Sequence, residues 1–122
     1  MNQEPSVSQP PLRRFKDADY IPLCANLAEV RANIDQLDRE IVALIADRGR
    51  YVKDAARFKA DSFQVSAPNR QQEVFDRVVA LAHEHGAYPE VVEACYRAMV
   101  AGFIAREQTY FTDMEPVEEG KK

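Results

Sequence analysis

The chain has 122 residues, a formal net charge of −4, and 16 Lys or Arg residues against 20 Asp or Glu residues. This length suits one small domain with a limited hydrophobic core. The mildly acidic balance argues against a dedicated nucleic-acid-binding protein, and the short basic run RRFK at 13–16 is too small to reverse it.

Both ends of the chain have the composition of poorly ordered segments. Residues 1–22 contain four prolines, and residues 112–122 read TDMEPVEEGKK. We therefore expect a flexible N-terminal extension over 1–22, a helical domain over 23–111 and a flexible C-terminal tail over 112–122. The first residues lack an apolar core of signal-peptide length, and no segment approaches the ~20 apolar residues of a membrane span, so no membrane partner is expected.

Cysteine and histidine are both sparse. The two cysteines, Cys24 and Cys95, lie far apart in helix-like contexts. Free thiols in a reducing cytoplasm are the preferred interpretation, with one structural disulfide as the alternative. His83 and His85 would point about 200° apart on a helix, which is a poor arrangement for one metal ion, so no metal site is expected.

A long amphipathic helix is predicted from about Asn26 to Lys59. At ~1.5 Å per residue it would be about 50 Å long, too long for a compact three-helix monomer of this size. We therefore expect a homodimer built around this helix. Gly49 inside the helix costs about 1 kcal/mol relative to Ala, which suggests a bend or a close approach there. The apolar residues alternate at spacings of three and four and form one stripe: Leu27, Val30, Ile34, Leu37, Ile41 and Leu44.

A second helix is expected after a loop at 60–69. Pro68 cannot continue a preceding helix but suits a new first turn, so this helix should run from Pro68 to about Glu84. Its inward-facing residues are predicted to be Val74, Val78 and Leu81.

A third helix is expected from Pro89 to about Phe111. Gly86 is a natural C-terminal stop for the preceding helix, and Pro89 is a natural start. No strand pattern is convincing, so the predicted fold class is all-α, with three helices per protomer and a long first helix. The inner face of the third helix should carry Val92, Tyr96, Met99, Val100, Phe103 and Ile104.

Charged residues interrupt the apolar faces of two of these helices. Arg48 lies seven residues after Ile41, where the next core residue is expected, and Lys59 lies eleven residues further on. Eleven residues are close to three helical turns, so both side chains should project from nearly the same face. Glu107 lies seven residues after Val100 and likewise extends an apolar stripe.

Spacing alone leaves three interpretations of these charges open. Their long side chains can place charged ends in water while the stems cover the core. Arg48 can instead form a buried ion pair with Asp38 or Glu107. An interior ring of Arg and Lys would suit a small dianion, because guanidinium groups bind carboxylates through two hydrogen bonds. Arg31 is turned about 100° from Arg48 and could serve a different protomer's pocket.

The segment LAEVRANIDQLDREIVALIADRGRYVKDAARFKA resembles the first helix of the all-α (AroQ-type) chorismate mutases. Its ending YVKDAARFKA, followed by APNR, is most similar to the subgroup that includes isochorismate pyruvate lyase. The resemblance covers about Leu27 to Phe111. It implies three helices per protomer, an intertwined homodimer with two shared active sites, and a small dicarboxylate substrate handled without a cofactor.

The resemblance also implies roles for four cations. Arg31 resembles the arginine that reaches into the neighbouring subunit's site to bind a substrate carboxylate. Arg48 resembles the arginine that binds a carboxylate within its own subunit's site. Lys59 resembles the lysine that contacts a carboxylate and the ether oxygen of the enolpyruvyl group. Arg70, in APNR, resembles the arginine that supports the carboxylate cluster at the start of the second helix.

Two positions depart from the pattern of many mutases. Gln71 stands where many have a Glu that binds the ring hydroxyl, and an amide can still form that hydrogen bond. Glu107 stands where bacterial members commonly have a Gln that donates to the ether oxygen, although fungal members carry Glu. An ionised Glu107 would repel the oxygen that gains negative charge, whereas a protonated Glu107 can donate to it.

The function that the resemblance implies is the Claisen rearrangement of chorismate to prephenate in aromatic amino-acid biosynthesis. This chemistry needs a restrained substrate and cations near the breaking C–O bond, but no nucleophile or metal. Isochorismate pyruvate lyase, which makes salicylate and pyruvate, is the first alternative. A non-catalytic helical dimerisation or regulatory module is the second.

Overall fold

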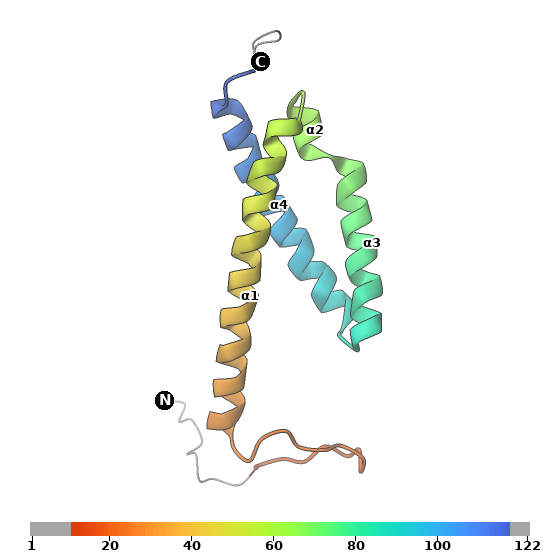
Figure 1. The fold of residues 1–122 in the computed structure, drawn as a ribbon. Coiled ribbons are helices and arrows are strands. Elements are labelled where there is room, and N and C mark those ends of the chain that lie inside the picture. Colours follow the sequence, from red (N-terminus) through yellow and green to blue (C-terminus); the bar gives the residue numbers. More distant parts are fainter. Residues whose placement is uncertain (1–10, 118–122) are drawn as a thin grey trace, which may run out of the picture. The chain divides into compact units, whose positions relative to one another are not determined.

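The computed structural model describes residues 11–117. Its elements are α1 (Leu27–Ala55), a 3₁₀ turn η1 (Ala56–Phe58), α2 (Ser62–Ser66), α3 (Pro68–His85) and α4 (Pro89–Asp113), as Figure 1 shows. The described residues contain no strand, so the all-α prediction with a long first helix is confirmed. Residues 1–10 of the predicted extension and 118–122 of the predicted tail lie outside the described residues.

The chain divides into two compact units, Met1–Ala46 and Asp47–Lys122. In the first unit, α1 begins where the sequence predicts. The Asn26 side chain accepts a hydrogen bond from the backbone N–H of Glu29 at 2.9 Å, and the Glu29 carboxylate accepts one from the N–H of Ala25 at 2.8 Å. This reciprocal capping satisfies N–H groups that have no partner within the helix.

The apolar stripe of α1 stays uncovered in the first unit. Leu27 is half-buried, but from Val30 onward the exposed fractions range from 39% for Val30 to 66% for Leu44, and α1 contains no buried residue. Exposed apolar side chains in such a continuous row are unusual for a soluble helix that has no partner. The burial that the sequence predicts for this stripe is therefore not supplied within the first unit, and the homodimer stays a prediction.

In the second unit, the first helix ends earlier than expected. The α-helix stops at Ala55, η1 tightens the next turn, and Lys59 already has an extended backbone with φ −97° and ψ 137°. The buried methyl group of Ala56, 1% exposed, lies within η1. The predicted helix end at Lys59 is therefore wrong by about one turn, which is a common uncertainty at helix termini.

The predicted loop at 60–69 contains a short helix, α2. Asp61 caps it by accepting a hydrogen bond from the backbone N–H of Gln64 at 2.9 Å, and Val65 within it is 1% exposed. Ala67 joins α2 to α3 in the left-handed region at φ 43°, so that Pro68 can open α3. The loop prediction was wrong because one buried residue and one cap suffice to hold a single helical turn.

α3 and α4 form an antiparallel hairpin, visible in Figure 1. Gly86 ends α3 at φ 70° and Pro89 opens α4, as predicted. Their shared core contains Val74, Phe75, Val78 and Val100, with Val92, Tyr96 and Ile104 packed against it.

One predicted core position of α3 is wrong. Leu81 is 42% exposed, whereas Ala82 is only 3% exposed. The buried side of α3 carries residues spaced four apart, namely Val74, Val78 and Ala82. Leu81 lies next to this side of the helix and not on it.

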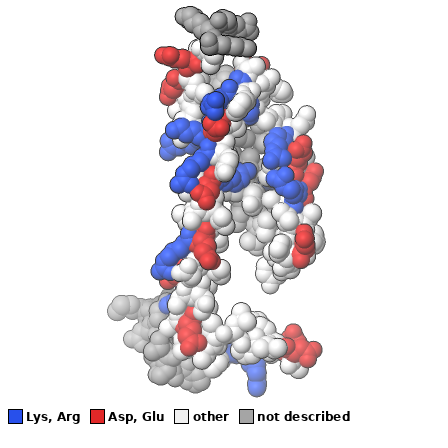
Figure 2. Space-filling model, viewed as in Figure 1, with Lys and Arg blue, Asp and Glu red and all other residues white. Residues whose placement is uncertain are grey.

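The surface shows mixed charge. On the face drawn in Figure 2, Lys and Arg residues are interspersed with Asp and Glu residues along the helices. None of the helices in the described part of the chain is long and apolar enough to cross a membrane. Cys24 and Cys95 are free thiols, as the preferred interpretation of the sequence expected.

Gly49 provides a test of the packing. A Cβ atom at Gly49 would lie 2.9 Å from Cε1 of Phe103, so the predicted close approach is present. Gly49→Ala should lower the free energy of unfolding by about 1 kcal/mol, because overpacking costs about 1–3 kcal/mol and helix propensity returns up to about 1 kcal/mol. Gly102→Ala is the matched control, since no atom beyond the neighbouring backbone of its own helix lies within 4 Å of its Cβ position. Urea unfolding should show Gly102→Ala to be stabilising; equal stabilisation by both variants would contradict the packing argument.

Candidate functional site

A cavity of about 300 Å³ lies within the second unit. Five of the six predicted site residues line it, and they come from α1, the segment after η1, α3 and α4. Arg31 does not line this cavity and belongs to the first unit. The predicted residues in the cavity wall are Arg48, Lys59, Arg70, Gln71 and Glu107.

Arg48 and Lys59 meet in this cavity for a different reason than the sequence suggested. The α-helix ends at Ala55, so a helical phase does not extend from Arg48 to Lys59. Instead, η1 and the extended backbone at Lys59 place its side chain in the same wall. The co-location was predicted, but the helical geometry offered as its cause was wrong.

Lys59 and Glu107 form the most buried charged contact of the site. The Lys59 ammonium lies 3.2 Å from Oε2 of Glu107, and the two side chains are 22% and 5% exposed. The ammonium also donates a hydrogen bond to the backbone carbonyl of Gln64 at 3.1 Å. Glu107 therefore pairs with Lys59 rather than with Arg48, the partner that the sequence offered as one alternative.

One oxygen of Glu107 has no hydrogen-bond partner among the described residues, and it is the same Oε2. The 3.2 Å distance to Lys59 satisfies an ion pair, but the direction of the contact does not satisfy a hydrogen bond. We therefore treat the contact as Coulombic. A buried oxygen without a hydrogen bond is costly, so its presence in a cavity wall indicates a place where a bound molecule could supply the missing partner.

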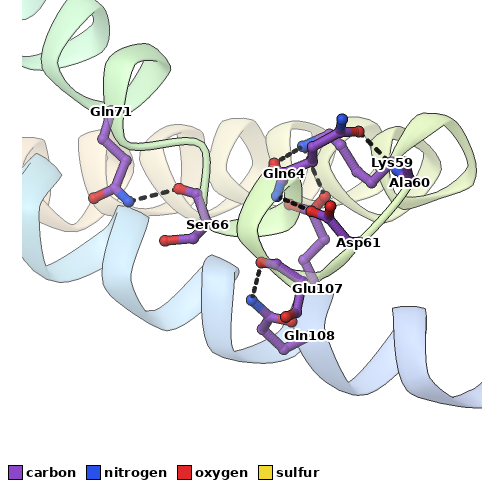
Figure 3. A network of polar contacts seen from close by, with 9 residues as sticks. Lys59, Ala60, Asp61, Gln64, Ser66, Gln71, Glu107 and Gln108 are labelled. Carbon is purple, nitrogen blue, oxygen red and sulfur yellow. Dashed lines mark hydrogen bonds and ion pairs between the residues drawn. The ribbon is translucent and has the colours of Figure 1, made fainter.

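A small polar network holds the segment that carries Lys59, as Figure 3 shows. The side-chain oxygen of Gln64 accepts a hydrogen bond from the backbone N–H of Ala60 at 2.7 Å. Gln108 on α4 donates to the backbone carbonyl of Ser62 at 2.9 Å and so connects α4 to α2. Gln108 was not among the predicted site residues; its position beside Glu107 is the only signal the sequence offers for this role.

Gln71 is held at the junction of α2 and α3. Its amide nitrogen donates to the backbone carbonyl of Ser66 at 2.6 Å (Figure 3). The amide oxygen therefore remains as an acceptor for a ligand hydroxyl. Arg70, its neighbour, is exposed and pairs with Glu73 at 3.3 Å, a surface contact of the kind that contributes about 0–1 kcal/mol.

Arg77 is a further cation of the wall that the sequence interpretation missed. It lies on α3 seven residues after Arg70, and that two-turn spacing could have identified it. With Arg48, Lys59 and Arg70 it makes four cations in the wall against one carboxylate, Glu107, a formal excess of three positive charges.

The chemistry of the wall favours a small anion with an apolar body. The cations suit carboxylates, and the apolar side chains would exclude water from the ligand's ring. No group of three or more His, Cys, Asp or Glu residues that could hold a metal ion occurs among residues 11–117. The apolar part of the wall includes Val52, Val65, Val74, Val100, Phe103 and Ile104.

The Lys59–Glu107 contact can be tested by its effect on stability. Lys59→Met leaves the Glu107 carboxylate buried without a cation and should lower the free energy of unfolding by roughly 3 kcal/mol. The double variant Lys59→Met/Glu107→Gln removes the charge as well and should recover most of that loss. Urea is the suitable denaturant because it adds no ions. Equal losses in the single and double variants would show that the pair is not coupled.

Comparisons with known proteins identify a family and several named relatives. Residues 30–108 match the family described as chorismate mutase type II. An isochorismate pyruvate lyase of Pseudomonas aeruginosa is 33% identical over 88 residues, which cover 72% of this chain and 87% of that protein.

Two further relatives are mutases by name. A chorismate mutase of Methanocaldococcus jannaschii is 28% identical over 90 residues, covering 73% of this chain and 91% of that protein. A bifunctional chorismate mutase/prephenate dehydratase of Aquifex aeolicus is 28% identical over 86 residues, covering 67% of this chain and 24% of that protein. Because the family match spans more than half of its residues, the chain belongs to the chorismate mutase type II family.

Proposed function

We propose that the protein is a chorismate mutase that rearranges chorismate to prephenate in one pericyclic step. The observation that carries the proposal is the cavity wall that joins Arg48, Lys59 and Glu107 beside apolar side chains. A dicarboxylate with a ring would place its charges on the cations and its ring against the apolar part. Family membership and the relatives named as chorismate mutases support the same activity.

The proposed mechanism is restraint combined with electrostatic stabilisation. The cations would hold the two carboxylates so that the substrate folds into the reactive, chair-like geometry, which lowers the entropic part of the barrier. As the C–O bond breaks, negative charge develops on the ether oxygen. Lys59, which is already oriented by the carbonyl of Gln64, would stabilise that charge without rearranging.

Glu107 has two possible contributions that differ in protonation. A protonated carboxyl group would donate a hydrogen bond to the ether oxygen, while an ionised one would serve only to hold Lys59. We propose the first role during turnover, because Glu107 lines the cavity and its Oε2 has no hydrogen-bond partner among the described residues, so a bound ether oxygen can provide one. Gln71 would accept a hydrogen bond from the ring hydroxyl through its free amide oxygen.

The second candidate is isochorismate pyruvate lyase. It is favoured by the 33% identity to a protein of that name, against 28% for the chorismate mutase of M. jannaschii. The same cations would hold isochorismate. The residues Gln71 and Glu107 favour the mutase instead. Gln71 can form a hydrogen bond with the ring hydroxyl, and Glu107 can form one with the ether oxygen.

A non-catalytic helical module is less well supported by the site. A module that only dimerises has no need to bury Glu107 at 5% side-chain exposure with an unpartnered oxygen in a cavity. Burying a carboxylate is unfavourable even beside a cation, because the desolvation cost can exceed the Coulombic gain, so a purely structural protein would gain little from it.

We also propose a homodimer in which Arg31 completes the site of the partner protomer. The support is the exposed stripe of α1, whose residues from Val30 through Leu44 are all 39% exposed or more. Burial of this stripe against a second copy would supply the apolar contact that a domain of this size lacks. Sedimentation velocity at micromolar concentration should give the mass of two chains; the mass of one chain would contradict the proposal.

Activity assays with separate substrates test the function. The protein should convert chorismate to prephenate and leave isochorismate unchanged; salicylate and pyruvate from isochorismate alone would establish the lyase instead. Lys59→Ala should reduce kcat by about 100-fold or more, as removal of an oxyanion donor does. Glu107→Gln retains a donor and should keep most of the turnover. An unchanged rate in Lys59→Ala would contradict the mechanism.

A further inference from the structure

Arg48 is held in a different way from two of the other cavity cations. Lys59 has a carboxylate and a backbone carbonyl as partners, and Arg70 has the carboxylate of Glu73. The guanidinium carbon of Arg48 instead lies 5.9 Å from the ring centroid of Tyr96 and 5.7 Å from that of Phe103. Arg48 forms no ion pair with any residue in the described part of the chain.

The two rings are fixed by different parts of the fold. Tyr96 and Phe103 lie seven residues apart on α4, two helical turns, so they share one face of that helix. Tyr96 packs against the core formed by Val74, Phe75, Val78 and Val100. The Phe103 ring lies against the backbone of α1 at Gly49, at a distance that a Cβ atom would not allow.

Aromatic rings orient a guanidinium group without neutralising it. A cation within about 6 Å of a ring is attracted to the negative face of the π system, and the ring takes up none of the five N–H donors in its plane. A carboxylate partner would occupy two of those donors and would have to be displaced by a ligand. Arg48 is therefore oriented in the cavity wall and retains its donors and its full charge.

Tyr96 does not line the cavity, although Arg48 and Phe103 do. Any effect of Tyr96 on a ligand must therefore pass through another residue. We propose that Tyr96 is a positioning residue that acts through Arg48, its ring holding the guanidinium ready to receive a ligand carboxylate. The identity of that ligand rests on the proposed function, whereas the positioning itself does not.

The first test needs no ligand. The Arg48 Nε–Hε signal in a nitrogen–proton NMR spectrum, assigned by its loss in Arg48→Lys, should lie upfield of exposed arginines because of the ring currents of Tyr96 and Phe103. Tyr96→Leu should move it towards the exposed arginines, and Tyr96→Phe, which keeps the ring, should leave it in place. A wild-type signal among the exposed arginines, or one unmoved in Tyr96→Leu, would overturn the inference.

The second test separates positioning from general destabilisation. Tyr96→Leu should raise KM about three- to fivefold with little change in kcat, because a contact of this kind acts equally in ground and transition states. Tyr96→Phe, which keeps the ring, should have the wild-type KM. In an Arg48→Gln background, Tyr96→Leu should have no further effect on KM, since the residue through which it acts is absent. A further rise in that background would overturn the inference.

Phe75→Leu is the matched control. Phe75 lies on α3, is 7% exposed and carries the guanidinium of Arg97 over its ring at 4.4 Å, but it does not line the cavity. This variant should lower stability while leaving both the Arg48 signal and KM unchanged; a KM rise equal to that of Tyr96→Leu would assign the effect to lost packing. If the wild-type protein converts neither chorismate nor isochorismate, the proposed function fails and the NMR test alone decides the positioning role.

Discussion

The contact between Lys59 and Glu107 determines how the second unit is assembled. It joins the segment that follows η1 to α4, two parts of the chain that are 48 residues apart in sequence. The ammonium also binds the carbonyl of Gln64, and Gln108 next to Glu107 binds the carbonyl of Ser62, so α2 is held from both sides. Because a buried carboxylate is tolerated only beside a cation or a donor, the cavity and the packing of α2 depend on the same two charges.

The exposed apolar surface of α1 links the stability of the fold to a partner chain. The fully buried apolar residues of the described chain lie in η1, α2, α3 and α4, and α1 has none. The hairpin of α3 and α4 has a core of its own, whereas the stripe of α1 has no cover among the described residues of the first unit. If a second copy covers it, as proposed, the residues that complete the site and those that stabilise the protein belong to the same interface.

Local chemistry explains which parts of the fold could be predicted. Pro68, Gly86 and Pro89 act within one helical turn, so the ends of α3 and the start of α4 followed from their residue types alone. The stripe of α1, nearly five turns long, was likewise visible from spacing. α2 and the end of α1 at Ala55 were not predicted, because they depend on burying Val65 and Ala56 against α4, contacts between segments distant in sequence.

In the candidate site, too, the residue types could be predicted from the sequence, whereas their contacts could not. The residue types of Arg48, Lys59 and Glu107 were conspicuous because charge interrupts apolar spacing. Their partners were not predictable: a ring for Arg48, a carbonyl for Lys59, and no hydrogen bond at all for Oε2 of Glu107. Those partners are set by tertiary geometry, which spacing along one helix does not contain.

The single residue Ala67 between α2 and α3 limits how this part of the chain can change during evolution. Its φ of 43° turns the chain directly from one helix into the next. Inserting or deleting one residue there would rotate α3 by about 100° about its axis relative to α2, and would carry Arg70 and Gln71 away from the cavity. The segment before α2 is constrained as well, because Lys59 and Ala60 bind Gln64 and Asp61 caps the helix. The joint at Ala67 is therefore expected to keep its length among relatives.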